Sequence, residues 1–141
     1  MKKLKFFGAE TKKTKHLSLA GESISAGFPS PADDFKESKI SIDQEVVKNE
    51  SATFYARVVG QSMQGAGLDD GDLIVIDRSQ EPGNGKIAVC YVDGEFTVKR
   101  LKVENECIYL MPENKKYKAL KITEENQLIR WGVVTYVIKK L

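Results

Sequence analysis

Histidine and cysteine, which supply many catalytic and metal sites, are scarce in this chain of 141 residues. Its one histidine, His16, lies in an N-terminal stretch without sustained periodicity, so we do not expect a Ser-His-Asp triad. The two cysteines, Cys90 and Cys107, lie in apolar, strand-like runs without metal-ligand spacing, which is typical of buried free thiols in a cytosolic protein. We therefore expect a cytoplasmic protein with no cofactor and no metal site.

Long apolar runs and a basic folded part are also missing. No run approaches the roughly 20 residues of a membrane span, and no apolar core follows the N-terminal lysines as in a secretory signal. Residues 1–26 carry a net charge of +4 and residues 27–141 one of −2, and the N-terminal stretch is too short for a helix-turn-helix module. We therefore expect no membrane association and no direct sequence-specific DNA binding.

What the sequence has instead is a series of short strand patterns. Apolar, β-branched and aromatic runs between turn signals predict strands over residues 52–59, 73–76, 86–92, 95–103, 107–111, 119–122 and 128–138, the last bent at Gly132. A short helix is predicted over residues 32–37 and a helical turn over residues 43–49. The predicted fold class is mainly β, with about seven to nine short strands. We expect an extended N-terminal arm over residues 1–31, with strand-like pieces around Phe6 and Leu17, and a β-rich domain over residues 32–141.

The connection between the first two strands of this domain is rich in glycine and contains the pair Ser62-Met63. Glycine allows a sharp turn, and a serine on such a turn has an exposed hydroxyl with backbone N–H groups nearby that could hold an oxyanion. The alternative is a plain glycine-rich connection in which Ser62 is an ordinary turn residue. The local pattern leaves both interpretations open.

A lysine lies on an apolar face of the predicted strand over residues 95–103. Because side chains alternate along a strand, Lys99 shares its face with Thr97 and Leu101, whereas Arg100 and Lys102 point to the other side. Such a lysine either extends its ammonium group to water or stays partly desolvated. Desolvation lowers the pKa of the amine, and the amine can then act as a base.

The dipeptide Ala26-Gly27 contains the least hindered peptide bond in a stretch that Pro29 and Pro31 keep extended. A peptidase binds its substrate in an extended conformation, and a small residue before the cut bond suits a shallow pocket. The same stretch is also consistent with a flexible linker.

In combination these segments resemble the LexA/UmuD family of self-cleaving peptidases, which use a Ser-Lys dyad. Within that family the chain is similar to the UmuD-like members, which lack a DNA-binding head. The segments that carry the resemblance are Ala26-Gly27-Phe28-Pro29-Ser30-Pro31-Ala32, Gly60-Gln-Ser62-Met63, Gly67-Leu68-Asp-Asp-Gly71-Asp72, Val92-Asp-Gly-Glu-Phe-Thr-Val-Lys99-Arg-Leu, Leu110-Met-Pro112-Glu-Asn114 and Gly132-Val-Val.

The resemblance implies roles for individual residues. Ser62 is the expected nucleophile and Lys99 the general base, and the bond that they cut joins Ala26 to Gly27. The backbone N–H of Ser62 or Met63 is the expected oxyanion donor. Lys99 must be neutral to accept the proton of Ser62, so its pKa has to fall from about 10.4 to roughly 7–8.

The resemblance also implies a biological role. Members of the family cut themselves in the SOS response when RecA filaments on single-stranded DNA stimulate them, and the trimmed form is an accessory subunit of an error-prone Y-family polymerase. The expected partners are a second copy in a homodimer, the RecA filament, the polymerase subunit and, as a further candidate, the sliding clamp. Two alternatives stay open: a non-enzymatic β-rich adaptor, and a self-cleaving phage-type regulator without a DNA-binding head.

Overall fold

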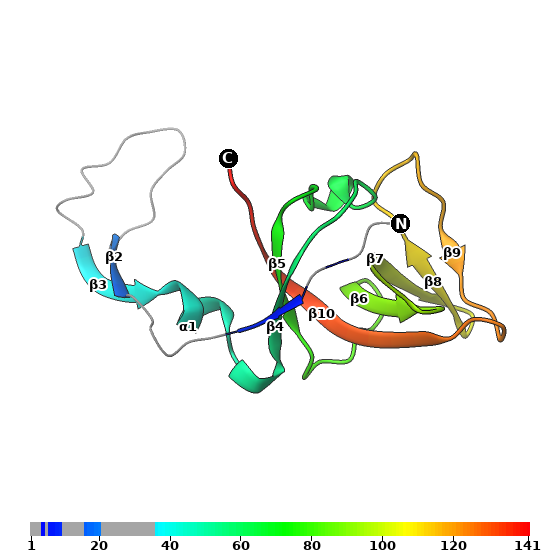
Figure 1. Ribbon diagram of the computed structural model, residues 1–141, viewed down its shortest axis with the longest axis horizontal. Helices are drawn as coiled ribbons and strands as arrows, with labels where there is room; N and C mark the ends of the chain where they lie inside the picture. The colour runs from blue at the N-terminus through cyan, green and yellow to red at the C-terminus, as the bar shows by residue number, and fades with distance from the viewer. Residues whose placement is uncertain (1–3, 5, 10–15, 21–35) are drawn as a thin grey trace. The chain divides into compact units, whose positions relative to one another are not determined.

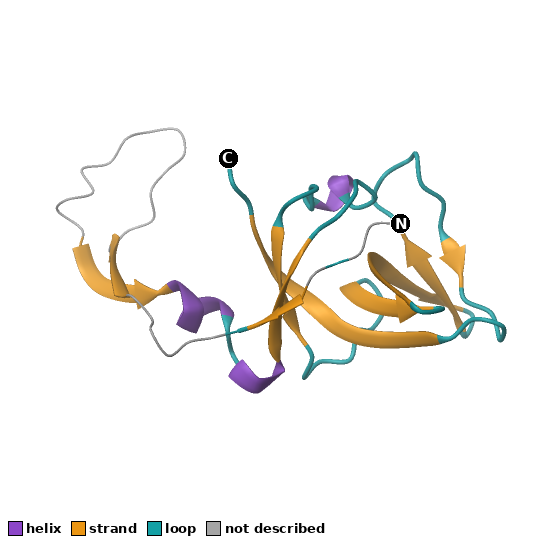
Figure 2. Ribbon diagram, viewed as in Figure 1, coloured by secondary structure: helices purple, strands orange, loops and turns teal. Residues whose placement is uncertain are grey.

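The computed structural model describes residues 4, 6–9, 16–20 and 36–141. The chain divides into two compact units, one made of Met1–Ala9 and Asn49–Leu141 and the other of Glu10–Lys48. Strands dominate the described residues, as Figures 1 and 2 show, so the predicted mainly β fold class is confirmed. The predicted division at residue 31 stays a prediction.

The larger unit is built on one antiparallel sheet of eight strands in the order β1-β4-β5-β10-β6-β7-β8-β9 (Figure 1). All seven strands predicted from residue 52 onward are present. The strands of the sheet are β1 (Phe6–Gly8), β4 (Thr53–Arg57), β5 (Leu73–Asp77), β6 (Ile87–Val92), β7 (Glu95–Glu104), β8 (Cys107–Met111), β9 (Leu120–Lys121) and β10 (Leu128–Ile138).

Two hydrophobic clusters fill the larger unit. In β6, Val89 belongs to the first cluster whereas Ala88 and Cys90 belong to the second, because neighbouring side chains of a strand point to opposite faces. The predicted burial of the free thiol is confirmed for Cys90, but Cys107 is only half-buried because it lies at the start of β8 beside an exposed turn. The first cluster consists of Ala56, Val58, Met63, Leu68, Ile74, Ile76, Val89 and Val98, and the second of Ala88, Cys90, Val92, Leu101 and Leu110.

The last strand, β10, lies in the middle of the sheet and bends there. Its first half pairs with β6 and its second half with β5, and the register of the β6 pairing shifts between Arg130 and Gly132. A Cβ atom on Gly132 would lie 2.7 Å from Cγ2 of Ile76, so this bend requires glycine. The predicted bend at Gly132 is confirmed.

In the smaller unit, β2 (His16–Ala20) pairs with β3 (Lys36–Ser41) in antiparallel register. The helix α1 (Ile42–Val46) follows, and the side chain of Ser41 accepts a hydrogen bond from the backbone N–H of Gln44 at its start. The helical turn predicted over residues 43–49 is therefore present, but it begins one residue earlier and ends three residues earlier than expected. The helix predicted over residues 32–37 is wrong for residues 36 and 37, because pairing with β2 outweighs their local helix propensity; residues 32–35 lie outside the described residues.

Candidate active site

Ser62 lies in the loop that joins β4 to β5, and the base of this loop is closed by backbone hydrogen bonds. The N–H of Val58 donates to the carbonyl oxygen of Asp72 at 2.8 Å, and the N–H of Gly71 donates to the carbonyl oxygen of Val58 at 2.8 Å. These two bonds continue the pairing of β4 with β5 into the loop. The two ends of the loop are therefore held together at the edge of the sheet.

The loop turns sharply at glycines with a left-handed backbone. Gly60 has a φ of +89° and Gly67 a φ of +83°, values that side chains with a Cβ rarely adopt. The carboxylate of Asp70 reaches back across the loop, where its Oδ1 accepts a hydrogen bond from the N–H of Gly60 at 2.7 Å. The glycines that suggested a turn in the sequence are therefore required by the conformation.

Glu113, which follows β8, holds the loop from the other side. Its backbone N–H donates to the carbonyl oxygen of Ser62 at 2.8 Å, and its carbonyl oxygen accepts a hydrogen bond from the N–H of Gly65 at 2.6 Å. The Glu113 side chain accepts a hydrogen bond from Nε of Arg100 at 2.6 Å. A residue far away in sequence thus fixes the backbone on both sides of Met63.

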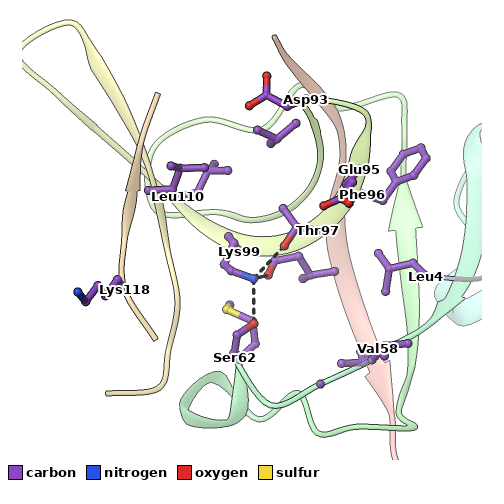
Figure 3. Close-up of a pocket in the computed structure, with 16 residues that line it drawn as sticks. Leu4, Val58, Ser62, Asp93, Glu95, Phe96, Thr97, Lys99, Leu110 and Lys118 are labelled. Atoms are coloured by element: carbon purple, nitrogen blue, oxygen red, sulfur yellow. Dashed lines mark hydrogen bonds between the residues drawn. The ribbon is translucent and has the colours of Figure 1, made fainter. Parts of the chain in front are cut away.

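The amino group of Lys99 meets the hydroxyl of Ser62 (Figure 3). Nζ of Lys99 lies 2.8 Å from Oγ of Ser62, 2.8 Å from Oγ1 of Thr97 and 3.1 Å from the carbonyl oxygen of Val98. A neutral amine fits these partners, because it can donate two hydrogen bonds to Thr97 and Val98 and accept one from the Ser62 hydroxyl.

Burial lowers the pKa of Lys99 below its ordinary value, because removing the ammonium group from water disfavours the charged form. A thiolate at Cys90 would oppose this shift by attracting the positive charge. Burial raises the pKa of Cys90 to about 11, however, so near neutral pH this neighbour is an uncharged thiol. The surroundings of Lys99 therefore favour the neutral amine that a general base needs.

The backbone N–H groups of Ser62 and Met63 are the oxyanion donors expected from the sequence. Among the described residues, no hydrogen bond uses the N–H of Ser62 or of Met63. The Met63 side chain is 2% exposed and packs in the first hydrophobic cluster, which anchors this turn. These two N–H groups on an anchored turn are therefore candidates to bind an oxyanion.

A cavity of about 380 Å³ opens over Ser62 and Lys99. Its apolar wall includes Leu4, Val58 and Phe96, and Figure 3 shows these side chains on the side of the cavity away from Lys118. Volumes of this order are typical of sites that hold small groups of atoms, such as a few side chains of a peptide. The hydroxyl, the amine and an apolar wall thus share one opening.

The structure brings two of the sequence-predicted residues together, Ser62 and Lys99, with Met63 beside them. His16 lies in β2, in the smaller unit. Ala26 and Gly27 lie outside the described residues.

Thr97 was predicted only as a neighbour on the same strand face, and its separation of two residues from Lys99 was the available signal. Glu113 had no local signal, because its contacts depend on how β8 packs.

The described part of the chain offers neither a metal centre nor a membrane-spanning helix. No group of three or more histidine, cysteine, aspartate or glutamate side chains there is arranged to hold a metal ion. No helix among the same residues combines the length and the apolar character that a membrane crossing requires.

Known proteins are similar to this chain over most of its length. The sequence profile of the family described as Peptidase S24-like matches residues 18–135. Protein SamA of Salmonella typhimurium is 43% identical over 122 residues, which cover 86% of this chain and 84% of SamA. Protein MucA of Escherichia coli is 42% identical over 115 residues, 80% of this chain and 77% of MucA. Protein ImpA of Shigella flexneri is 39% identical over 123 residues, 86% of this chain and 83% of ImpA. The chain therefore belongs to the Peptidase S24-like family, and the predicted resemblance to UmuD-like members of the LexA/UmuD peptidases is confirmed.

Proposed function

We propose that the chain is a serine peptidase that cuts itself between Ala26 and Gly27, with Ser62 as nucleophile and Lys99 as general base. The observation that carries this proposal is the 2.8 Å separation of Lys99 Nζ and Ser62 Oγ. Nucleophile and base within hydrogen-bond distance are the signature of covalent catalysis by a hydroxyl group. The lowered pKa of Lys99, which results from its burial, supports the role of base.

The reaction follows from this arrangement. The neutral amine of Lys99 takes the hydroxyl proton while Oγ of Ser62 attacks the carbonyl carbon of Ala26, and the N–H groups of Ser62 and Met63 hold the resulting oxyanion. Lys99 then donates the proton to the leaving amine of Gly27, which releases the new N-terminus. A water molecule, activated by the same amine, hydrolyses the ester on Ser62 and frees residues 1–26.

Thr97 has a positioning role in this scheme. Its hydroxyl oxygen and the carbonyl oxygen of Val98 hold Nζ of Lys99 beside Ser62. Since the amine has only one lone pair, fixing its N–H bonds on these two acceptors points that lone pair at the Ser62 hydroxyl. The base is thus oriented before the substrate arrives.

The biological part of the proposal rests on the family resemblance and on the UmuD-like relatives. RecA filaments on single-stranded DNA would stimulate cutting by favouring the state in which residues around Ala26 occupy the cavity, a population shift that adds no catalytic group. The product, residues 27–141, would act as a homodimeric accessory subunit of an error-prone Y-family polymerase in SOS mutagenesis. The sliding clamp is a further candidate partner in this role.

The experiment that tests the peptidase is mass spectrometry of the purified chain after incubation at alkaline pH. We expect two products, residues 1–26 and residues 27–141, and neither from the Ser62→Ala or Lys99→Ala chain. Matched controls are Ser79→Ala and Lys102→Ala, because Ser79 is an exposed turn residue and Lys102 an exposed residue of the strand that carries Lys99. An intact wild-type chain would favour the non-enzymatic adaptor, and a cut elsewhere would overturn the substrate assignment.

A further inference from the structure

The N-terminal strand β1 is an edge strand of the main sheet. Phe6 pairs with Ala56 and Gly8 with Phe54 in antiparallel register, and the N–H of Ala9 donates to the carbonyl oxygen of Thr53 at 3.2 Å. In the sheet order, β4 lies between β1 and β5. β1 therefore covers the hydrogen-bonding edge of β4 that would otherwise end the sheet.

Phe6 also completes an aromatic cluster. Its ring lies 4.7 Å from the ring of Phe96 and 4.9 Å from that of Trp131, measured between centroids. Phe54 lies 5.2 Å from Trp131 in the same cluster. The neighbouring Phe7 has 51% of its surface exposed, so only one of the two phenylalanines of β1 packs inward.

Leu4 extends the same segment to the candidate active site. Its side chain lines the cavity that holds Ser62 and Lys99, and Figure 3 shows it between Val58 and Phe96. One short segment thus covers a strand edge, an aromatic cluster and one wall of the cavity.

A cut between Ala26 and Gly27 would remove the covalent link between this segment and the rest of the sheet. After the cut, only the three residues of β1 and the pairing of β2 with β3 would hold residues 1–26. Because the chain no longer offsets the entropy lost on association, we expect the fragment to dissociate on dilution. Loss of the segment would leave the backbone of β4 unpaired along one edge, with Phe96 and Trp131 beside it.

We propose that self-cleavage turns this edge of β4 into an acceptor site for an extended peptide segment with an aromatic residue in the position of Phe6. The proposal rests on the proposed function, since the cut releases the edge. The partner segment would replace the contacts that β1 makes in the uncut chain. It would pair with the backbone of residues 54–56 and place one aromatic ring against Phe96 and Trp131. A partner that adds such a strand would bind the trimmed chain and be excluded from the full chain by β1.

The first arm of the test uses the uncut chain and Trp131, its one tryptophan. In the Ser62→Ala background, Phe6→Ala should shift the Trp131 emission to longer wavelength and increase its quenching by acrylamide, whereas the matched Phe7→Ala should change neither. Circular dichroism checks that the sheet is retained. Unchanged emission in Phe6→Ala would overturn the proposal whether or not the wild-type chain cuts itself.

The second arm uses the wild-type chain after self-cleavage. We expect residues 1–26 to separate from the trimmed chain on a sizing column at low concentration, and the Trp131 emission to shift to longer wavelength. A peptide of residues 1–9, added in large excess to compensate for its weak binding, should reverse that shift saturably. The same peptide with Phe6→Ala should not reverse it. Co-elution of the fragment, no effect of the peptide, or a dimer that blocks the peptide would each overturn the proposal. A chain that never cuts itself overturns the proposed function and the release step, while the first arm still reports whether β1 covers the edge.

Discussion

The carbonyl oxygen of Ser62 accepts a hydrogen bond from the backbone N–H of Glu113 at 2.8 Å, so a residue beyond β8 fixes the backbone at the candidate nucleophile. The second bond of this pair, from the N–H of Gly65 to the Glu113 carbonyl oxygen, is 2.6 Å long. The loop with Ser62 and the strand pair β7–β8 are therefore locked together. The position of the hydroxyl relative to Lys99 depends on that lock as well as on the two side chains themselves.

Replacing Gly65 by alanine should break this lock. A Cβ atom there would lie 2.6 Å from the Glu113 carbonyl oxygen, and backbone atoms cannot move aside cheaply. We expect Gly65→Ala to lower the free energy of unfolding by about 1–3 kcal/mol, the usual cost of a forced close contact, and to slow self-cleavage strongly. Denaturant unfolding and the rate of product formation measure the two effects.

Gly83→Ala is the matched control for this change. A Cβ atom on Gly83 would meet no heavy atom within 4 Å. Its effect on stability should be within about 0.5 kcal/mol, as for most surface substitutions. Equal effects of the two substitutions would mean that the contact between Gly65 and Glu113 does not constrain the loop.

The rate of self-cleavage should rise with pH and then level off. Only neutral Lys99 can accept the Ser62 proton, so each pH unit below the pKa of Lys99 should change the rate about tenfold. Because burial lowers that pKa, the plateau should begin below the ordinary lysine value of about 10.4. Rates measured by product formation across this range give the profile.

Two variants test the assignment of that profile to Lys99. Lys99→Arg should be inactive at every pH in the range, because a guanidinium group does not lose its proton there. His16→Ala should keep the wild-type profile. Loss of cleavage in His16→Ala, or a rate that is flat from neutral to alkaline pH, would rule out Lys99 as the base.

The burial of Lys99 should lower the free energy of unfolding near neutral pH. Its pKa is lower in the folded than in the unfolded chain, so between these two values the unfolded chain binds more protons and the free energy of unfolding rises with pH. We expect Lys99→Met to be more stable than the wild-type chain at pH 7, with a difference that shrinks as the pH rises towards the ordinary lysine value. Thermal unfolding of both chains, with Ser62→Ala in each to prevent cutting, measures this. A difference that does not depend on pH would contradict it.

The contact of Lys139 with Asp72 should lower the pH at which the protein unfolds in acid. Asp72 is only 7% exposed, and although burial alone raises its pKa, hydrogen bonds from the Lys139 amine and the Asp69 N–H bring that pKa below the ordinary value. The stability from this carboxylate is present above its unfolded-state pKa and is lost as the pH falls through the lower folded-state pKa. In Lys139→Met, the pKa of Asp72 should rise, so acid unfolding should begin at a higher pH.

Circular dichroism during an acid titration follows that transition. Lys102→Met is the matched control, because Lys102 forms an ion pair with Glu104 in which both side chains are about half exposed. The control should unfold at the wild-type pH. A similar shift in both variants would point to overall charge and away from the Asp72 contact.

The strands were predictable because their signals are local, whereas the approach of Ser62 to Lys99, 37 residues apart, was implied only by the family resemblance. Apolar, β-branched and aromatic runs between turn signals predicted β6 and β7 within one residue of their ends. The alternation along β7 correctly placed Thr97 on the face of Lys99. The helix expected over residues 32–37 failed at residues 36 and 37 because its partner, β2, lies about twenty residues away, and local propensity does not report such pairing.

The contacts of Glu113 and β1 could not be predicted for a related reason. Glu113 acts through its backbone, which every residue has, so its side chain type gives no signal for the bonds to Ser62 and Gly65. Phe6 and Phe7 are adjacent and chemically identical, and only the pairing with β4 decides which ring packs on Trp131. Sequence patterns assign such residues to a strand but do not choose the neighbour of that strand.

The central position of β10 has a consequence for the timing of activity during synthesis. β5 and β6 are not paired with each other, and β10 is the strand that lies between them. The loop with Ser62 belongs to the β4–β5 side and Lys99 to the β6–β7 side, so the sheet joins these two candidate residues only through residues 128–138. A ribosome makes these residues after both halves. The nascent chain therefore carries the candidate nucleophile and the candidate base on separate hairpins, and it cannot assemble the sheet that joins them until β10 has emerged.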